Sequence, residues 1–330
     1  MANISLLQGI KMAAKEIHNY ITDHPIVVSY EVTFSCNCNC RHCDLGGLVK
    51  DEKQITPEEY GDITRQLKPL AAQISGGEPL IRKDIAAIVK AIKQAGAEYI
   101  ILVTNGVLLN ESNYLQLRAA GVQQFSVSLD FPDERHDEFR HRPGLYKRLE
   151  QNLPKLAKLG FKDIILNTAI TKANVREILP LAKKATEWGV DISYSAYTAL
   201  RTGNKGYCLN NGEDLEILRQ SINELVMLKK QGAHLINPEL TLQDTMKFFE
   251  RENMPNCQAG IRFLVVMPDG SLVPCSLHRS KYATQKEMIE DFSRTNRCGS
   301  CYVAIRAYSE MSLMSHTRNL PKYIQQMVLH

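Results

Sequence analysis

An alternation of strand and helix patterns runs through most of this chain and limits its fold more than any other feature. Short runs of β-branched and aromatic residues, typical of buried strands, alternate with longer segments whose apolar residues recur at helical spacing. Six such units lie between about residues 26 and 232. Parallel strands joined by helices form a sheet with right-handed crossovers. Six units in a row fit a partial barrel or a doubly wound sheet, and the local pattern does not separate the two.

The expected strands cover residues 26–34, 71–75, 99–103, 124–129, 163–170 and 190–195, and the expected helices cover residues 56–67, 84–94, 110–119, 146–159, 174–188 and 213–231. Two helix starts carry a specific signal. Thr56 precedes a proline and stands three residues before Glu59, which is the pattern of a capping box. Asn174 stands three residues before Glu177, and we expect it to cap the following helix.

The segments on either side of this region follow different patterns. Residues 4–21 place apolar side chains on one helical face, which we expect to pack on the outside of the sheet, with membrane-surface or partner docking as the alternative. Residues 261–267 and 271–275 flank a Pro-Asp-Gly turn and predict a β-hairpin. We therefore expect three parts: an N-terminal amphipathic helix in residues 1–25, a core domain over residues 26–235, and a smaller domain of hairpin and helices over residues 236–330.

Charge and hydropathy exclude several classes of protein. The 40 basic and 36 acidic residues nearly balance, and no basic run is longer than a pair, so we expect no dedicated nucleic-acid surface. No apolar run reaches the roughly 18 residues that span a bilayer. The first residues lack the charged start and uninterrupted apolar core of a secretion signal. We therefore expect a cytoplasmic protein with no transmembrane segment.

Cysteine is the residue whose distribution bears most directly on chemistry. Nine cysteines in a chain that is not exported are expected to stay thiols, for metal binding or catalysis. Cys36, Cys38, Cys40 and Cys43 follow the first expected strand, at the edge where parallel α/β folds place active sites. Thiolates at the spacing of Cys36, Cys40 and Cys43 can hold three irons of a 4Fe–4S cluster and leave the fourth iron open. A zinc site that adds Cys38 or His42 is the alternative.

A second set of cysteines lies in the last quarter of the chain and consists of Cys257, Cys275, Cys298 and Cys301. Its final Cys-x2-Cys pair is typical of either a zinc knuckle or an iron–sulfur site, and the residues alone leave both open. Cys208 stands apart from both sets. We interpret Cys208 as a buried or idle thiol, with hydrogen-atom donation as the alternative.

Three motifs resemble those of the radical S-adenosylmethionine (radical SAM) superfamily. They are CNCNCRHC over residues 36–43, SGGEP over residues 75–79 and TNG over residues 104–106, each directly after a strand. The resemblance covers about residues 26–232 and implies an α/β fold, a partial (β/α)6 barrel of the TIM type. It also implies a 4Fe–4S cluster whose open iron binds S-adenosylmethionine. One electron then cleaves that compound, and the 5′-deoxyadenosyl radical abstracts hydrogen from a substrate.

The resemblance implies a role for each matching residue. The cluster ligands are Cys36, Cys40 and Cys43. The segment that holds the methionine ammonium is Gly76, Gly77 and Glu78, whose glycines allow close backbone approach. Contacts to ribose or carboxylate are assigned to Ser128 and Asp130, with Asn167 as a positional match. Ordinary strand-end hydrogen bonding is the alternative for Ser128 and Asn167. Cys38 is extra to the pattern, and His42 stands where the family often has an aromatic residue near adenine.

For the C-terminal segment the resemblance implies a twitch domain, a shortened SPASM domain with one auxiliary 4Fe–4S cluster on Cys257, Cys275, Cys298 and Cys301. Such a cluster would serve electron transfer or electrostatic tuning, and zinc remains the alternative. The implied partners are a small-molecule substrate and an external one-electron donor such as flavodoxin or ferredoxin.

We expect the substrate to be a small organic metabolite or a cofactor or sugar precursor. A ribosomal peptide or a lipid would be converted by the same chemistry, whereas a non-enzymatic iron–sulfur or zinc-binding protein is the alternative of another class. Loop residues could bind an anionic substrate, or could instead be solvated surface charges; they are His141, Arg142 and Arg201.

Overall fold

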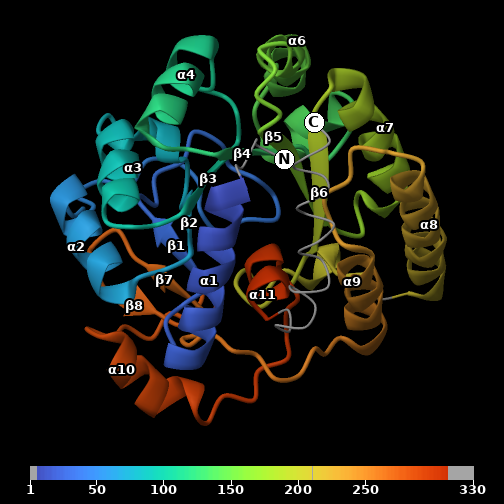
Figure 1. The fold of residues 1–330 in the computed structure, drawn as a ribbon. Helices are drawn as coiled ribbons and strands as arrows, with labels where there is room; N and C mark the ends of the chain where they lie inside the picture. The colour runs from blue at the N-terminus through green and yellow to red at the C-terminus, as the bar shows by residue number, and fades with distance from the viewer. Residues whose placement is uncertain (1–5, 210, 311–330) are drawn as a thin grey trace.

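The computed structural model describes residues 6–209 and 211–310. Its strands are β1 (Val27–Glu31), β2 (Ala71–Ser75), β3 (Tyr99–Thr104), β4 (Gln124–Ser128), β5 (Ile164–Ile170), β6 (Asp191–Ala196), β7 (Phe263–Val266) and β8 (Leu272–Val273). They form one sheet in the order β6-β5-β4-β3-β2-β1-β7-β8 (Figure 1), and neighbours from β6 to β7 are parallel. A doubly wound sheet reverses its strand order part-way, and this sheet does not between β1 and β6. The partial barrel is therefore confirmed.

The α-helices are α1 (Leu6–Thr22), α2 (Pro57–Leu67), α3 (Ile85–Gln94), α4 (Glu111–Ala120), α5 (Arg135–Arg140), α6 (Leu145–Ala157), α7 (Ile178–Trp188), α8 (Gly212–Lys230), α9 (Glu239–Arg251), α10 (Gln285–Met288) and α11 (Ala304–Ser309). Short 3-10 turns cover Pro79–Ile81, Val175–Glu177 and Lys205–Tyr207, and a π-helical turn covers Ile289–Ser293. Helices α2, α3, α4, α6, α7 and α8 lie around the outside of the strands (Figure 1). Apolar side chains of the strands and of this outer layer are fully buried and form the core, for example Ile74, Ile88 and Leu102.

Helix α1 packs on the outside of the barrel, as expected, at the end where the strands begin. The side-chain amide of the fully buried Asn19 donates to the carbonyl of Pro25 at 2.9 Å. The Arg262 guanidinium donates to the carbonyl of Tyr20 at 2.9 Å and lies over the Tyr20 ring. The expected helix start at residue 4 lies outside the described residues. The outward face of α1 exposes Leu7, Ile10 and Ile21.

The two predicted helix caps have different outcomes. The Thr56 hydroxyl accepts from the Glu59 amide and the Glu59 carboxylate accepts from the Thr56 amide, so the capping box is confirmed. The prediction for Asn174 is wrong. Its side-chain oxygen accepts from the Thr171 amide at 2.8 Å, so it is not available to cap the helix. A 3-10 turn follows it, and α7 begins only at Ile178.

The predicted hairpin is present as β7 and β8, which pair antiparallel. Asp269 fixes its turn, because its carboxylate accepts from the Ser271 hydroxyl at 2.6 Å, and Gly270 has a φ of +85° that favours glycine. The sequence pattern predicts this hairpin as part of a smaller domain over residues 236–330. In the structure β7 pairs in parallel with β1, from Val27 opposite Phe263 onward, so the hairpin extends the barrel sheet.

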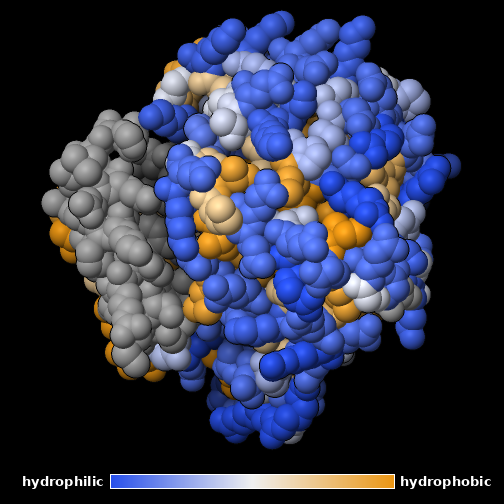
Figure 2. All heavy atoms as spheres, turned by 90° about the vertical axis from the view of Figure 1, so that its right-hand side faces the viewer, coloured by the Kyte–Doolittle hydropathy of each residue, from blue (hydrophilic) through white to orange (hydrophobic). Residues whose placement is uncertain are grey.

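Among the described residues, no helix is both long and apolar enough to cross a bilayer. The face turned toward the viewer in Figure 2 is mainly hydrophilic, with apolar side chains in small scattered groups.

Candidate functional site

The first cysteine loop leaves the carboxyl end of β1 and folds back on itself. The amide of Cys36 donates to the carbonyl of Gly47 at 2.8 Å, and the amide of Cys43 donates to the carbonyl of Cys40 at 3.2 Å. Cys36 and Cys40 are buried, whereas Cys43 is exposed. The three thiols at the predicted ligand positions therefore lie on one loop that is held by its own backbone hydrogen bonds, and only the Cys43 thiol is exposed.

The two glycines after β2 lie directly against the segment that leads into this loop. The amide of Gly77 donates to the carbonyl of Thr33 at 2.7 Å, and the amide of Glu78 donates to the carbonyl of Ser35 at 2.9 Å. A Cβ at Gly76 would collide with the Thr33 carbonyl oxygen, and one at Gly77 with the Ser35 carbonyl oxygen. Only glycine allows this approach, so the second motif fixes the backbone just before Cys36.

Glu78 joins the second motif to the third. Its fully buried carboxylate accepts from the Leu80 amide at 3.0 Å, the Thr104 hydroxyl at 2.8 Å and the Asn105 amide at 2.7 Å. Burial raises the pKa of Glu78 to about 7 despite these bonds. Asn105 in turn donates to the Cys36 Sγ at 3.8 Å. The three motifs are thus one connected network at the carboxyl ends of β1, β2 and β3.

The environment of the first cysteine loop suits metal ligation. A hydrogen bond from the Cys38 thiol lowers the pKa of Cys36 and that of Cys40, and the charge of Arg140 lowers both further. The thiolate is the form of cysteine that binds metal, so this setting fits two of the three predicted ligands. Cys38 is itself buried between them as a hydrogen-bond donor.

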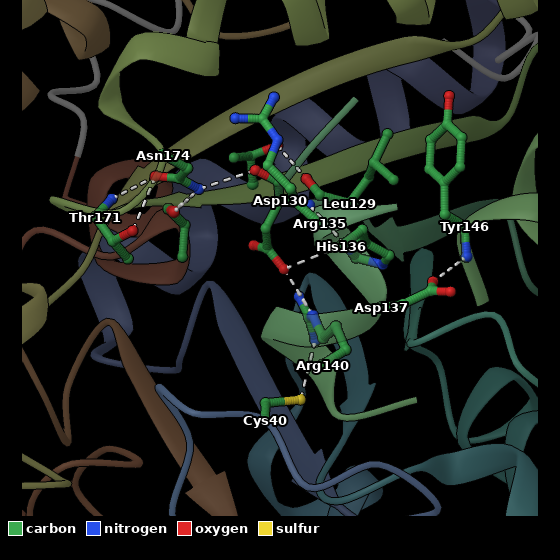
Figure 3. Close-up of polar contacts among 12 residues, drawn as sticks. Cys40, Leu129, Asp130, Arg135, His136, Asp137, Arg140, Tyr146, Thr171 and Asn174 are labelled. Carbon is green, nitrogen blue, oxygen red and sulfur yellow. Dashed lines mark hydrogen bonds and ion pairs between the residues drawn. The ribbon is translucent and has the colours of Figure 1, made fainter. Parts of the chain in front are cut away.

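The predicted contacts on β4 and β5 lie in two different settings. Ser128 at the end of β4 is in register with Asn167 in the middle of β5, and both are half-buried. Asp130 is fully buried, and its carboxylate accepts from the Arg140 Nε at 2.6 Å, with His136 beside it (Figure 3). Burial opposes ionisation, but the Arg140 charge holds the pKa of Asp130 below its usual range. Asp130 is therefore held in an internal ion pair, and only Ser128 and Asn167 stay partly open.

The second set of cysteines is gathered from three segments of the chain. Cys257, Cys275 and Cys301 are buried and Cys298 is half-buried. All of these except Cys301 belong to an apolar cluster that includes Phe263. Burial raises the pKa of Cys257 to about 12 and that of Cys275 to about 11. Among the described residues, no three histidine, cysteine, aspartate or glutamate side chains stand close enough together to hold a single metal ion.

Arg201 is a partly buried charge and not the solvated surface charge that its loop position suggested. Only 18% of its side chain is exposed, and its guanidinium lies 2.6 Å from the Asp44 carboxylate and 3.7 Å from that of Glu31. Arg279, from the segment after Cys275, lies 3.0 Å from the same Glu31 carboxylate. This network connects the two cysteine segments. Glu31 and Arg279 are not among the predicted site residues, although a glutamate in a mainly apolar strand is a signal for a buried partner.

Comparison with known proteins agrees with this site. The family model described as "Radical SAM superfamily" matches residues 30–192. An "AdoMet-dependent heme synthase" of Oleidesulfovibrio alaskensis is 30% identical over 320 residues, which cover 83% of this chain and 79% of that protein. The chain belongs to the radical SAM superfamily. Radical SAM proteins use a 4Fe–4S cluster and S-adenosylmethionine, so the chain is an enzyme with these cofactors.

Two further relatives have named activities. An "AdoMet-dependent heme synthase" of Methanosarcina barkeri is 36% identical over 192 residues, 56% of this chain, and the match spans only 53% of that protein. A "Probable GTP 3′,8-cyclase" of Methanothermobacter marburgensis is 27% identical over 83% of this chain and 92% of that one. Among solved structures, Streptococcus suis SuiB bound to S-adenosylmethionine has a TM-score of 0.63 at 21% identity, over 94% of this chain and 71% of that one. That similarity supports the radical SAM fold.

Proposed function

We propose that Cys36, Cys40 and Cys43 hold the 4Fe–4S cluster at which this enzyme cleaves S-adenosylmethionine to start a radical reaction on a small organic metabolite. The observation that supports this most is the continuous network from the cysteine loop through Gly77 and Glu78 to Asn105. When bound, the two cofactors supply a 5′-deoxyadenosyl radical that removes a hydrogen atom from the substrate.

The residues of the chain bind S-adenosylmethionine and orient it. The backbone at Gly76 and Gly77 offers a close approach for the methionine part of S-adenosylmethionine, and Glu78 offers a carboxylate whose three internal bonds leave one acceptor position. Ser128 and Asn167 are the half-buried polar groups for ribose or carboxylate. We do not assign Asp130 to the cofactor, because Arg140 and His136 already surround its carboxylate.

A small metabolite is favoured over a peptide or a lipid as substrate. The relatives found by sequence, at 27–36% identity, carry the names heme synthase and GTP 3′,8-cyclase, which refer to small molecules. The SuiB structure bound to its precursor peptide is only 19% identical and supports the fold alone. The guanidinium groups of Arg201 and Arg279 are already paired with Asp44 and Glu31, so they do not by themselves indicate an anionic substrate.

We also propose an auxiliary 4Fe–4S cluster on the second set of cysteines, within a C-terminal domain over residues 236–330. The thiols of Cys257, Cys275 and Cys298 lie in one apolar cluster with Phe263 of β7, and the Cys301 thiol is also buried. This apolar setting suits an electron-transfer centre shielded from water. An external one-electron donor such as flavodoxin or ferredoxin would supply the first cluster. Residues 1–25 form the separate N-terminal helical part, and residues 26–235 form the radical SAM core.

The test is cleavage of S-adenosylmethionine by the anaerobically purified, reduced enzyme. We expect 5′-deoxyadenosine from the native chain, and none after Cys36, Cys40 and Cys43 are all replaced by alanine, because the cluster would have no ligands. The Cys208→Ala variant is the matched control, since Cys208 lies outside both sets, and it should keep the product. Chromatography of the nucleoside product provides the readout. Persistence of 5′-deoxyadenosine in the triple variant would remove these cysteines from the reaction.

A further inference from the structure

Helix α5 holds the middle cysteine of the first loop, although it belongs to none of the three motifs. The amide of Asn39 donates to the Arg140 carbonyl at 3.3 Å, and the amide of Arg41 donates to the Phe139 carbonyl at 3.1 Å. These two bonds flank Cys40. The His42 ring stacks on the Phe139 ring, with centroids 4.5 Å apart. The carboxyl end of α5 therefore fixes the loop on both sides of Cys40.

Arg140 adds a charged contact to this backbone clamp. Its Nε donates to the Asp130 Oδ2 at 2.6 Å, and its Nη1 lies 3.7 Å from the Cys40 Sγ (Figure 3). Figure 3 shows the guanidinium between the carboxylate and the sulfur, so Arg140 is the nearer charge to Cys40. The side chain of Arg140 is only 11% exposed and that of Asp130 is fully buried. Little water is present to screen the arginine from the sulfur.

The partner of Arg140, Asp130, is itself held in place through its backbone. The backbone amide of Asp130 donates to the His136 Nδ1 at 3.2 Å, and the carbonyl of Asp130 accepts from the Asn174 side chain at 3.2 Å. These two bonds hold the backbone of Asp130 beside α5, from which its buried carboxylate reaches the guanidinium. The side chain of Asn174 does not cap α7 and instead holds the Asp130 backbone.

We propose that Arg140 is a positioning residue that donates a charge-assisted hydrogen bond to the Cys40 sulfur and raises the reduction potential of the first cluster. The inference rests on the proposed function, because it requires Cys40 to be a cluster ligand. Reduction adds negative charge to an iron–sulfur cluster and its thiolates, and a cation that donates to a ligand sulfur stabilises that charge. None of the three family motifs includes Arg140 or α5.

The test is a redox titration of the holoenzyme followed by electron paramagnetic resonance. The signal that changes when S-adenosylmethionine is added identifies the first cluster. Because Arg140→Met alone would leave Asp130 buried and unpaired, the main variant combines Arg140→Met with Asp130→Asn. We expect at least a tenfold shift toward the oxidised cluster, about 59 mV more negative for a one-electron couple. Iron content should stay at the native value.

Two single variants complete the design. Arg140→Lys keeps the charge and should recover most of the native potential. Arg135→Met removes an arginine from the same helix that binds Asp133 and Glu177 at the surface, and it should leave the potential unchanged. Equal potentials in the double variant and the Arg135→Met variant would overturn the proposal. Loss of the first cluster from the folded Arg140→Lys and double variants would also overturn it, since Arg140 would then serve assembly. A native chain that assembles no cluster on the first loop would instead refute the proposed function.

Discussion

At the scale of single residues, the buried charges and imidazoles of this protein lie where segments must be held together. Glu78 connects the second motif to the third, because its carboxylate accepts from Thr104 and Asn105. Asp130 connects the end of β4 to α5 through Arg140, and Glu31 pairs with two arginines from distant segments. Each would be costly without its partners, because an unpaired buried charge is strongly disfavoured. His136 belongs to this group, since it is fully buried and accepts from the Asp130 amide.

His136 should make the protein less stable in acid. Burial lowers the pKa of His136 to about 3. Below about pH 6.5 the unfolded chain takes up a proton at this position and the folded chain does not, so the free energy of unfolding falls as pH falls, by up to about 1.4 kcal/mol per unit. His136→Asn keeps an acceptor for the Asp130 amide and lacks the titration. Urea unfolding measures the free energy of unfolding of the native protein and of His136→Asn between about pH 7 and pH 5. The difference between the two free energies should become smaller as the pH falls. A constant difference would contradict this role.

Single residues also show what the sequence allowed us to predict at the site. The thiol positions and the glycines followed from spacing and from the strand that precedes each motif. The ion pair between Asp130 and Arg140 did not, because nothing local indicates that a residue after β4 turns inward to meet a helix end. The expected exposure of Arg201 failed for the same reason, since its partners Glu31 and Asp44 are far away in the chain.

At the scale of elements, local signals decided which helices could be predicted. Helix α2 was found with its capping box, whereas α5 was missed because six residues are too few to show a helical repeat in a window of about 11 residues. Helix α11 is equally short, and its buried residues, among them Ala307 and Arg306, connect it to its surroundings. The fully buried Arg306 donates to the carbonyls of Cys301, Met254 and Pro255 and pairs with Glu310.

Replacing Arg306 with methionine should destabilise the C-terminal segment strongly. The change leaves Glu310 and the carbonyls of Met254, Pro255 and Cys301 without their partner, and breaking a buried pair in this way costs about 3–5 kcal/mol. The matched control is Arg176→Ala, whose exposed pair with Glu213 should contribute no more than about 1 kcal/mol. Anaerobic urea denaturation of the two variants provides the measurement. Similar losses for both arginines would show that Arg306 is not the anchor of α11.

At the scale of the whole molecule, the continuous sheet joins parts that the sequence presented as separate. The order of the strands could not be predicted, because strand patterns carry no information about neighbours. The pairing of β7 with β1 could not be predicted either, since more than 200 residues separate the two strands in the chain. That pairing places the strand before the first cysteine loop next to the hairpin that leads to Cys275.

The second set of cysteines should support turnover without being required for cleavage of S-adenosylmethionine. We expect Cys298→Ala combined with Cys301→Ala to lower the iron content from about eight to about four atoms per chain. Uncoupled 5′-deoxyadenosine formation should fall less than conversion of the substrate. Iron analysis and product assays under anaerobic conditions measure both. An equal loss of the two activities would indicate a structural role, and zinc in place of the missing iron in the native chain would exclude an auxiliary cluster.

The parallel ladder between β1 and β7 also decides how this enzyme can be dissected. Cutting the chain before residue 236 would remove one neighbour of β1 and leave the backbone groups that face β7 unpaired, among them the Val27 amide, which donates to the Arg262 carbonyl. Bare apolar strand edges recruit other chains and aggregate. We therefore expect the C-terminal segment to protect this edge of the barrel sheet from aggregation, so studies of the catalytic core are best made on the intact polypeptide.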